Sequence, residues 1–157
     1  MRDVIGYLIG FLMFVVGVPA VMWWVSGRPF PYAPDVYSMT LSVMLAVMGL
    51  ALSIWSIVHM RKVGKGNPMD AYNHEIAPRT KHLMTDGPYG FSRNPMLVGI
   101  YFYDMGVMLW LQELWPLAVF AVEALLLSLQ VRSEERRLEA DFGEEYLAYK
   151  RRVHKYL

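Results

Sequence analysis

Hydrophobic residues occur along this chain in long unbroken runs rather than in narrow periodic stripes. No charged side chain stands between Val4 and Val25, and none stands between Val36 and Met60. Both runs exceed the roughly 20 residues that an α-helix needs to cross the core of a bilayer. Neither run has the polar face that a surface helix of a soluble bundle would show. We therefore predict two transmembrane helices, 4–25 and 36–60.

Two shorter apolar runs follow, 95–111 and 114–131, and each contains one acidic residue, Asp104 or Glu123. Because only a very short polar stretch separates them, we interpret the pair as a tight helical hairpin that crosses the membrane and returns. The predicted fold class is an all-α integral membrane protein with four transmembrane helices in a single domain, 1–157. A soluble bundle is less consistent with the first two runs, which have no polar face.

Lysine and arginine are concentrated in the loop 61–94 and in the tail 132–157, whereas the loop between the first two helices carries only Arg28. The positive-inside rule then predicts that the loop, the tail and the N-terminus are cytoplasmic, as in a prokaryotic inner-membrane protein. Tryptophans near the opposite helix ends are typical of an aromatic belt at a membrane surface. These are Trp23, Trp24, Trp110 and Trp115.

The tail carries apolar residues at helical spacing, interrupted by Gly143. This pattern predicts an amphipathic helix, or two, lying under the membrane domain. Glu134 and Glu135 flank the apolar stripe, where a solvated charged face would lie opposite it. The stripe consists of Val131, Leu138, Phe142, Tyr146, Tyr149 and Val153.

A polar pair, Arg93 and Asn94, stands directly before the third predicted helix, and Glu134 and Glu135 stand directly after the fourth. Since a hairpin returns to the side it left, we expect the two pairs to lie close together. Asn94 followed by a proline is typical of a helix N-cap, and Arg93 beside Glu134 would form an ion pair. With the aromatic rings of Tyr89 and Phe91 and the segment 61–86, these residues would form a half-buried pocket facing the cytosol.

Composition excludes several other kinds of site. The chain of 157 residues is 55% hydrophobic and 18% charged, with a net charge of +1. It has no cysteine, and it shows no basic cluster with interleaved aromatics, so we expect no disulfide and no nucleic-acid partner. The four histidines lack the spacing of metal ligands, so no metal is expected. Gly6 and Gly10 form a GxxxG motif that would allow, without requiring, oligomer formation.

Asp104 and Glu123 lie at nearly equal distances from the predicted hairpin tip and therefore at a similar depth. Acidic residues inside a membrane are candidates for function by default. They would either line a substrate path and bind a polar headgroup, or join the hairpin as a proton-sharing pair or through hydrogen bonds to Tyr101 or Ser128. The sequence leaves both alternatives open.

Two motifs, "KHLMTDGPYGFSRNPMLVG" at 81–99 and "EERRLEADFGEEYLAYKRRV" at 134–153, carry a family resemblance. At this separation, the chain resembles the isoprenylcysteine carboxyl methyltransferase and phospholipid methyltransferase superfamily. The resemblance covers roughly the C-terminal half, 81–153. It implies an integral membrane enzyme that uses S-adenosyl-L-methionine and acts on a lipophilic substrate drawn from the bilayer.

The resemblance also implies site residues. Arg93 and Glu134 would be the catalytic pair, within a cofactor set that comprises His82, Leu83, Met84, Tyr89, Arg93, Asn94, Pro95, Met96 and Glu134. Candidate substrate residues are Asp104, Glu123, Gln130, Arg132 and Glu135. Leu97 stands where the family has a tyrosine. Gln130 replaces the arginine that binds a substrate carboxylate, which weakens the expectation of a prenylcysteine substrate.

The residue types suit the cofactor independently of the resemblance. A carboxylate suits its ammonium group, an arginine suits its carboxylate, and aromatic faces suit its adenine and sulfonium. Two other classes stay open: a sterol-type NADPH-dependent membrane reductase, and a non-enzymatic membrane scaffold with the same fold. The methyl acceptor is also open among a phospholipid amine, a prenylated carboxylate and a small hydrophobic metabolite.

Overall fold

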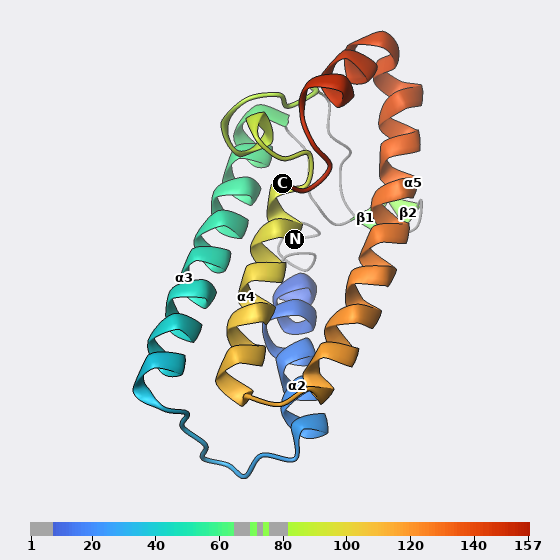
Figure 1. Ribbon diagram of the computed structural model, residues 1–157. Helices are drawn as coiled ribbons and strands as arrows, with labels where there is room; N and C mark the ends of the chain where they lie inside the picture. Colours follow the sequence, from blue (N-terminus) through green and yellow to red (C-terminus); the bar gives the residue numbers. More distant parts are fainter. Residues whose placement is uncertain (1–7, 65–69, 72–73, 76–81) are drawn as a thin grey trace.

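The computed structural model describes residues 8–64, 70–71, 74–75 and 82–157, which form an elongated helical bundle (Figure 1). Within them, the only strands are β1 and β2, two residues each, which pair antiparallel. The all-α expectation therefore holds apart from this short pair. The elements are η1 (Phe11–Gly17), α2 (Val18–Ser26), α3 (Val36–His59), η2 (Met60–Gly64), β1 (Asp70–Ala71), β2 (His74–Glu75), η3 (Gly87–Gly90), α4 (Pro95–Leu111) and α5 (Trp115–Arg152).

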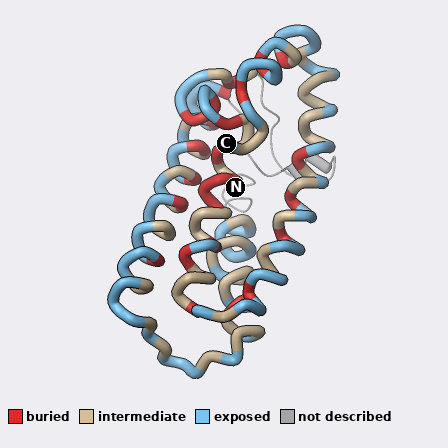
Figure 2. Tube along the Cα trace, in the orientation of Figure 1, coloured by how far each residue is buried: buried red, intermediate tan, exposed pale blue. Residues whose placement is uncertain are grey.

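Three of the described helical stretches are long and apolar enough to cross a membrane: Leu8–Ser26, Val36–Gly64 and Trp115–Arg152. Large apolar side chains such as Val47, Ile54 and Leu125 are exposed on their outer surfaces, and Figure 2 shows these faces in pale blue. A soluble protein would not present so much apolar surface to water. The chain is therefore an integral membrane protein. The helix α4 is shorter, at 17 residues, so the fourth crossing stays a prediction.

The helix boundaries agree with the predicted spans at α4 and differ elsewhere. The second predicted span does not stop at Met60 but continues through the π-helical segment η2 to Gly64. The expected separate tail helix is wrong in its start, because α5 runs on from the apolar stretch to Arg152. Its direction changes at Gly143, where φ is 52° and ψ is −127°. Of the GxxxG pair, Gly6 lies outside the described residues.

The helices α3 and α4 pack closely through small residues. A Cβ atom added at Gly99 would meet the Ser53 side chain and would lie 2.5 Å from the Gly49 carbonyl oxygen. One turn along, the Ser53 hydroxyl donates a hydrogen bond of 3.0 Å to the Met96 carbonyl. Small residues allow helix backbones to approach in this way within membranes, where packing rather than water exclusion drives association. The pair α3–α4 is thus the tightest contact in the bundle and supports the start of α4.

At the end of the bundle away from Asn94, Arg28 fastens the loop after α2 to the end of α4. Its guanidinium donates to the carbonyls of Leu111 (3.0 Å) and Gln112 (3.3 Å) and pairs with Glu113 at 3.0 Å. The same group stacks 4.6 Å from the ring centre of Tyr32. The last carbonyls of a helix have no partner within the helix, so Arg28 supplies the missing donors.

Replacing Arg28 with alanine should lower the free energy of unfolding by about 1–3 kcal/mol, because charge-assisted hydrogen bonds to helix-end carbonyls are lost. Thermal melting in detergent would measure the change. The matched control is Arg151→Ala, which removes an exposed arginine at the other end of the bundle. Equal melting temperatures for the two variants would contradict this account of the cap.

Candidate functional site

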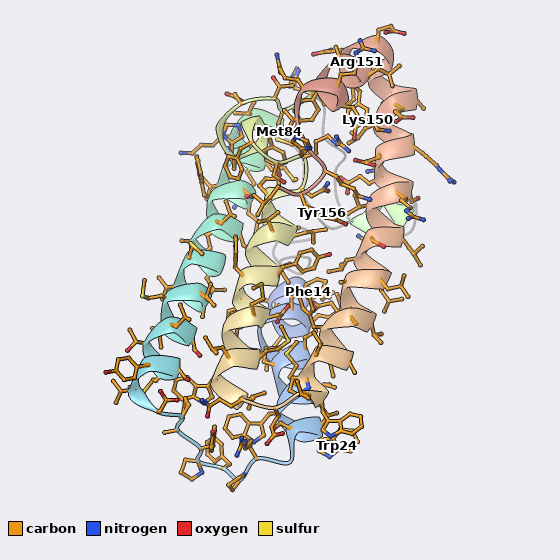
Figure 3. The ribbon with its side chains drawn as sticks, viewed as in Figure 1. Phe14, Trp24, Met84, Lys150, Arg151 and Tyr156 are labelled. Atoms are coloured by element: carbon orange, nitrogen blue, oxygen red, sulfur yellow. The ribbon has the colours of Figure 1, made fainter. Side chains whose placement is uncertain are left out.

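A pocket lies between the start of α4, the η3 turn and the middle of α5. It consists of two adjoining cavities that share five lining residues, Met60, Tyr89, Arg93, Asn94 and Glu134. The membrane half extends along α4 and α5, and its further lining is Pro95, Met96, Leu97, Leu127, Gln130 and Val131. The outer half extends toward the distal part of α5, and its further lining is Leu83, Met84, Glu135, Leu138, Tyr146 and Tyr149. Figure 3 shows Met84 at this end of the bundle.

The η3 turn places Tyr89 in the pocket wall. Gly87 has a φ of +55°, and a Cβ atom there would lie 2.7 Å from the His59 ring. His59 in turn contacts Asp86 at 2.9 Å, which holds the turn against the end of α3. From the other side, the Tyr149 hydroxyl donates to the Tyr89 carbonyl at 2.7 Å. Burial raises the pKa of Tyr89, with Glu134 adding to the effect, so its ring stays a neutral phenol.

Arg93 pairs with Glu135 and not, as the sequence predicts, with Glu134. Its Nε and Nη2 atoms donate to one Glu135 carboxylate oxygen at 3.0 and 2.7 Å. Its Nη1 atom donates to the carbonyls of Val153 at 2.6 Å and Lys150 at 3.2 Å. The turn at Gly143 explains the difference, because it returns the distal part of α5 to the start of α4. Arg93 therefore joins three parts of the chain.

Asn94 is the N-cap residue of α4 and Pro95 follows it in the first turn, as predicted, but the Asn94 side chain makes no capping hydrogen bond. Its side-chain nitrogen instead donates to the Lys155 carbonyl at 2.9 Å. Its backbone carbonyl still accepts from Val98 at 3.1 Å, as the first residue before a helix does. The backbone amide of Arg93 donates to the His154 carbonyl at 2.9 Å. We call residues 150–157, which these contacts hold, the strap.

Glu134 differs from its neighbour Glu135 in having no hydrogen-bond or ion-pair partner among the described residues. Its side chain lines both halves of the pocket, and no described residue donates a hydrogen bond to it. It lies on α5 beyond the apolar stretch 115–131. Removal from solvent raises its pKa above the ordinary value of 4.5, and the nearby charge of Glu135 raises it further. A cationic ligand group beside this carboxylate would relieve both effects.

The structure brings together most of the residues singled out from the sequence. Of the predicted cofactor set, all line one half of the pocket or the other except His82, which is exposed. Among the candidate substrate residues, Gln130 and Glu135 line the pocket, whereas Arg132 is exposed and does not. Phe91 also lies outside the lining; it is 43% exposed and packs against Trp55.

Sequence reasoning missed several pocket residues. Tyr146 and Tyr149 were identifiable as part of the apolar stripe, but the stripe alone did not show that the chain turns back at Gly143. Met60, at the end of α3, carried no signal because it looked like one more apolar residue of a transmembrane run. The missed lining residues are Met60, Leu127, Val131, Leu138, Tyr146 and Tyr149.

Asp104 and Glu123 lie side by side between α4 and α5 and interact with each other, both buried. Neither carboxyl group accepts a hydrogen bond from a described residue, so the expected bonds to Tyr101 and Ser128 are wrong. The Ser128 hydroxyl donates to the Leu125 carbonyl instead. Neither acid lines either half of the pocket described above. Within the described residues, no group of three or more candidate ligands would hold a metal ion.

Comparison with known proteins gives a consistent result. A family model described as "Phospholipid methyltransferase" matches residues 37–145. Protein-S-isoprenylcysteine O-methyltransferase of Rattus norvegicus is 31% identical over 113 residues, which is 69% of this chain and 39% of the relative. The chain thus corresponds to well under half of that protein's length. No solved structure matches. The matched region includes the start of α4, the η3 turn and both glutamates, and the resemblance in the two motifs is confirmed: the chain belongs to the phospholipid methyltransferase family.

Proposed function

We propose that the chain is a membrane methyltransferase that uses S-adenosyl-L-methionine as methyl donor and a lipophilic molecule of the bilayer as acceptor. The observation that carries this proposal is the position of the Glu134 carboxylate, which pairs with no described residue, at the junction of an aromatic, polar half-pocket and an apolar half-pocket. An acid in that position suits a donor that lies in the outer half and carries an ammonium group. The apolar membrane half suits an acceptor that enters from lipid.

The outer half-pocket suits the donor. Tyr89, Tyr146 and Tyr149 offer buried aromatic surfaces to a nucleoside or a sulfonium. Leu83 and Met84 add backbone and side-chain contacts beside the η3 turn, and Asn94 completes the wall of this half at the start of α4. Pro95 and Met96 continue the wall into the membrane half. Glu134 would bind the donor's ammonium group, which also lowers the cost of keeping this carboxylate charged.

The membrane half-pocket suits the acceptor, since its wall is apolar apart from Gln130 and the shared polar residues. The donor supplies an electrophilic methyl group, which the nucleophilic atom of the acceptor takes in an in-line displacement. The protein's contribution is to align the two molecules and to exclude water from between them. Gln130, on the wall of this half, is the residue we assign to the acceptor side, whereas Glu135 lies in the outer half behind Arg93.

The predicted topology belongs to the same proposal. With α4 as a fourth crossing, the pocket, the strap and the lysine- and arginine-rich segments all lie on the cytoplasmic side, as in an inner-membrane protein of a prokaryote. The water-soluble donor then reaches the outer half directly. Asp104 and Glu123, deeper between α4 and α5, serve as a structural pair in this account.

Calorimetry on purified protein in lipid nanodiscs tests the proposal. S-adenosylhomocysteine, which is the donor's product form, should bind, and NADPH should not. Binding of NADPH alone would favour a reductase, and binding of neither nucleotide would favour a scaffold. Incubation with radiolabelled donor and a total lipid extract should then transfer label to a lipid-soluble product.

A further inference from the structure

The strap returns from the end of α5 to the start of α4 and lies between these two helices (Figure 1). We propose that Arg93 and Asn94 are positioning residues that hold the strap there, and that a lipophilic molecule enters the membrane half-pocket from the bilayer when the strap moves aside. The proposed function supplies the reason for such an entry, but the strap and the route can be tested without any methyl donor.

Two adjacent residues hold the strap by its backbone. The Arg93 side chain donates to the carbonyls of Lys150 and Val153, and its amide donates to that of His154. The Asn94 side chain donates to the carbonyl of Lys155. Carbonyls in the last turn of a helix and beyond its end need partners from elsewhere. Here the four carbonyls just named find their partners at the start of α4. The strap position therefore depends on Arg93 and Asn94.

The side chains of the strap pack against residues that line both halves of the pocket. Val153 packs with Tyr146 and Tyr149, which line the outer half. Tyr156 packs against the cluster of Leu97, Ile100, Leu127 and Val131, from which the wall of the membrane half is largely built. Figure 3 shows Tyr156 and Phe14 in the space between α4 and α5, two helices that diverge from their hairpin in Figure 1. The strap thus packs against wall residues of both halves of the pocket.

The hydrogen bonds of Arg93 indicate positioning rather than direct ligand binding. A guanidinium group has five N–H donors in a planar fork. Glu135 and the strap carbonyls already engage both Nη atoms and Nε, and the side chain is only 9% exposed. To present its fork to an anionic ligand, Arg93 would have to release Glu135 or the strap. Because Arg93 also lies on the pocket wall, a movement of its side chain would affect both the strap and the ligand in the pocket.

The strap can move without disturbing the bundle. It lies outside regular helix after Arg152. Its contacts are a few hydrogen bonds, the ion pair of Lys150 with Glu139, and two packed side chains, Val153 and Tyr156. Segments with so few buried contacts open at a small fraction of the global unfolding free energy. The core contact between α3 and α4 includes no strap residue. Opening of the strap is therefore a local event.

Cysteine accessibility tests the route, because the chain has no cysteine of its own. Leu127→Cys places a thiol on the wall of the membrane half-pocket, where Leu127 is 6% exposed. In nanodiscs, its labelling rate is measured with a membrane-partitioning reagent, N-pyrenylmaleimide, and with a charged maleimide that stays in water. Added to this background, Arg93→Lys, Asn94→Ala and Tyr156→Ala should each raise the rate with the first reagent roughly tenfold or more.

The control is Glu145→Gln, which changes an exposed residue of α5 that lies outside the strap and outside the pocket lining. It should leave both labelling rates unchanged. The proposal is overturned if the three strap variants label like the control, or if both reagents gain equally, since that means general loosening. Three independent variants guard against one that fails to fold. If S-adenosylhomocysteine does not bind, the proposed function is contradicted, but the proposal about the strap is not.

Discussion

Glu134→Gln should reduce the affinity for S-adenosylhomocysteine by roughly 30-fold to several thousand-fold while the protein stays folded. The range corresponds to the 2–5 kcal/mol typical of removing one partner from a buried, hydrogen-bonded charge pair. A surface ion pair contributes only about 0–1 kcal/mol, so the two situations are clearly distinguishable. Glutamine keeps the size of the side chain and removes only the charge.

Folding should be unaffected because Glu134 makes no hydrogen bond with a described residue in the unliganded protein. Its raised pKa indicates that ionisation is unfavourable there. The contribution of Glu134 to the stability of the unliganded protein should therefore be most favourable below the ordinary carboxyl pKa. This contribution should be lost as pH rises through the raised pKa. Glu134→Gln should remove this pH dependence and leave melting unchanged or slightly improved.

Ligand binding should show the opposite pH dependence. An ammonium group needs the ionised carboxylate, so affinity in the wild type should increase as pH rises through the raised pKa of Glu134. In Glu134→Gln the profile should be flat over that range. Calorimetric titration at several pH values measures both effects, with Glu139→Gln, on the same helix and 34% exposed, as the control. If Glu134→Gln binds S-adenosylhomocysteine with wild-type affinity, the Glu134 carboxylate does not bind the ligand.

Gly99→Ala should cause a large loss of stability for the addition of a single methyl group. The added Cβ would lie 2.5 Å from the Gly49 carbonyl oxygen and 2.8 Å from the Ser53 amide nitrogen. Both are backbone atoms of α3, so relief requires the two helices to separate. Overpacking typically costs about 1–3 kcal/mol, and a clash with backbone belongs at or above the top of that range.

Separation of α3 and α4 would also displace the start of α4, and with it Arg93 and Asn94. We therefore expect Gly99→Ala to lower both the melting temperature and the yield of monodisperse protein, and to weaken ligand binding. The control is Gly90→Ala, where the added Cβ would meet its nearest neighbour, the Thr85 carbonyl oxygen, at an ordinary 3.7 Å. If both variants have the same melting temperature, the close α3–α4 contact is not essential for stability.

The predictability of the fold from sequence follows from which interactions are local. Long charge-free runs are sufficient to identify a membrane helix, because the bilayer excludes nearly every alternative. This explains why α4 and most of α3 were predictable to the residue. The continuation of α5 past Val131 was not predictable, since polar residues end a membrane span but do not end a helix.

The site was predictable in its location and less so in its pairings. A hairpin brings residues 93–94 and 134–135 to the same end regardless of detail, so the cluster could be inferred. Which glutamate pairs with Arg93 depends on helix rotation and on the return of the chain after Gly143, and both are tertiary properties. Asn94 had a typical N-cap sequence, but the strap carbonyl at Lys155 competes for its side chain and wins.

The turn at Gly143 sets a strict length for the chain between the two glutamates and the tyrosines Tyr146 and Tyr149. Each residue of a helix advances the rotation by about 100°. One residue inserted or deleted between Glu135 and Gly143 would turn the returning segment away from the pocket and separate Val153 from Arg93. Substitutions on the exposed face of this stretch should be well tolerated, whereas a change in its length should not. In related chains, this stretch should therefore vary in composition and stay constant in number of residues.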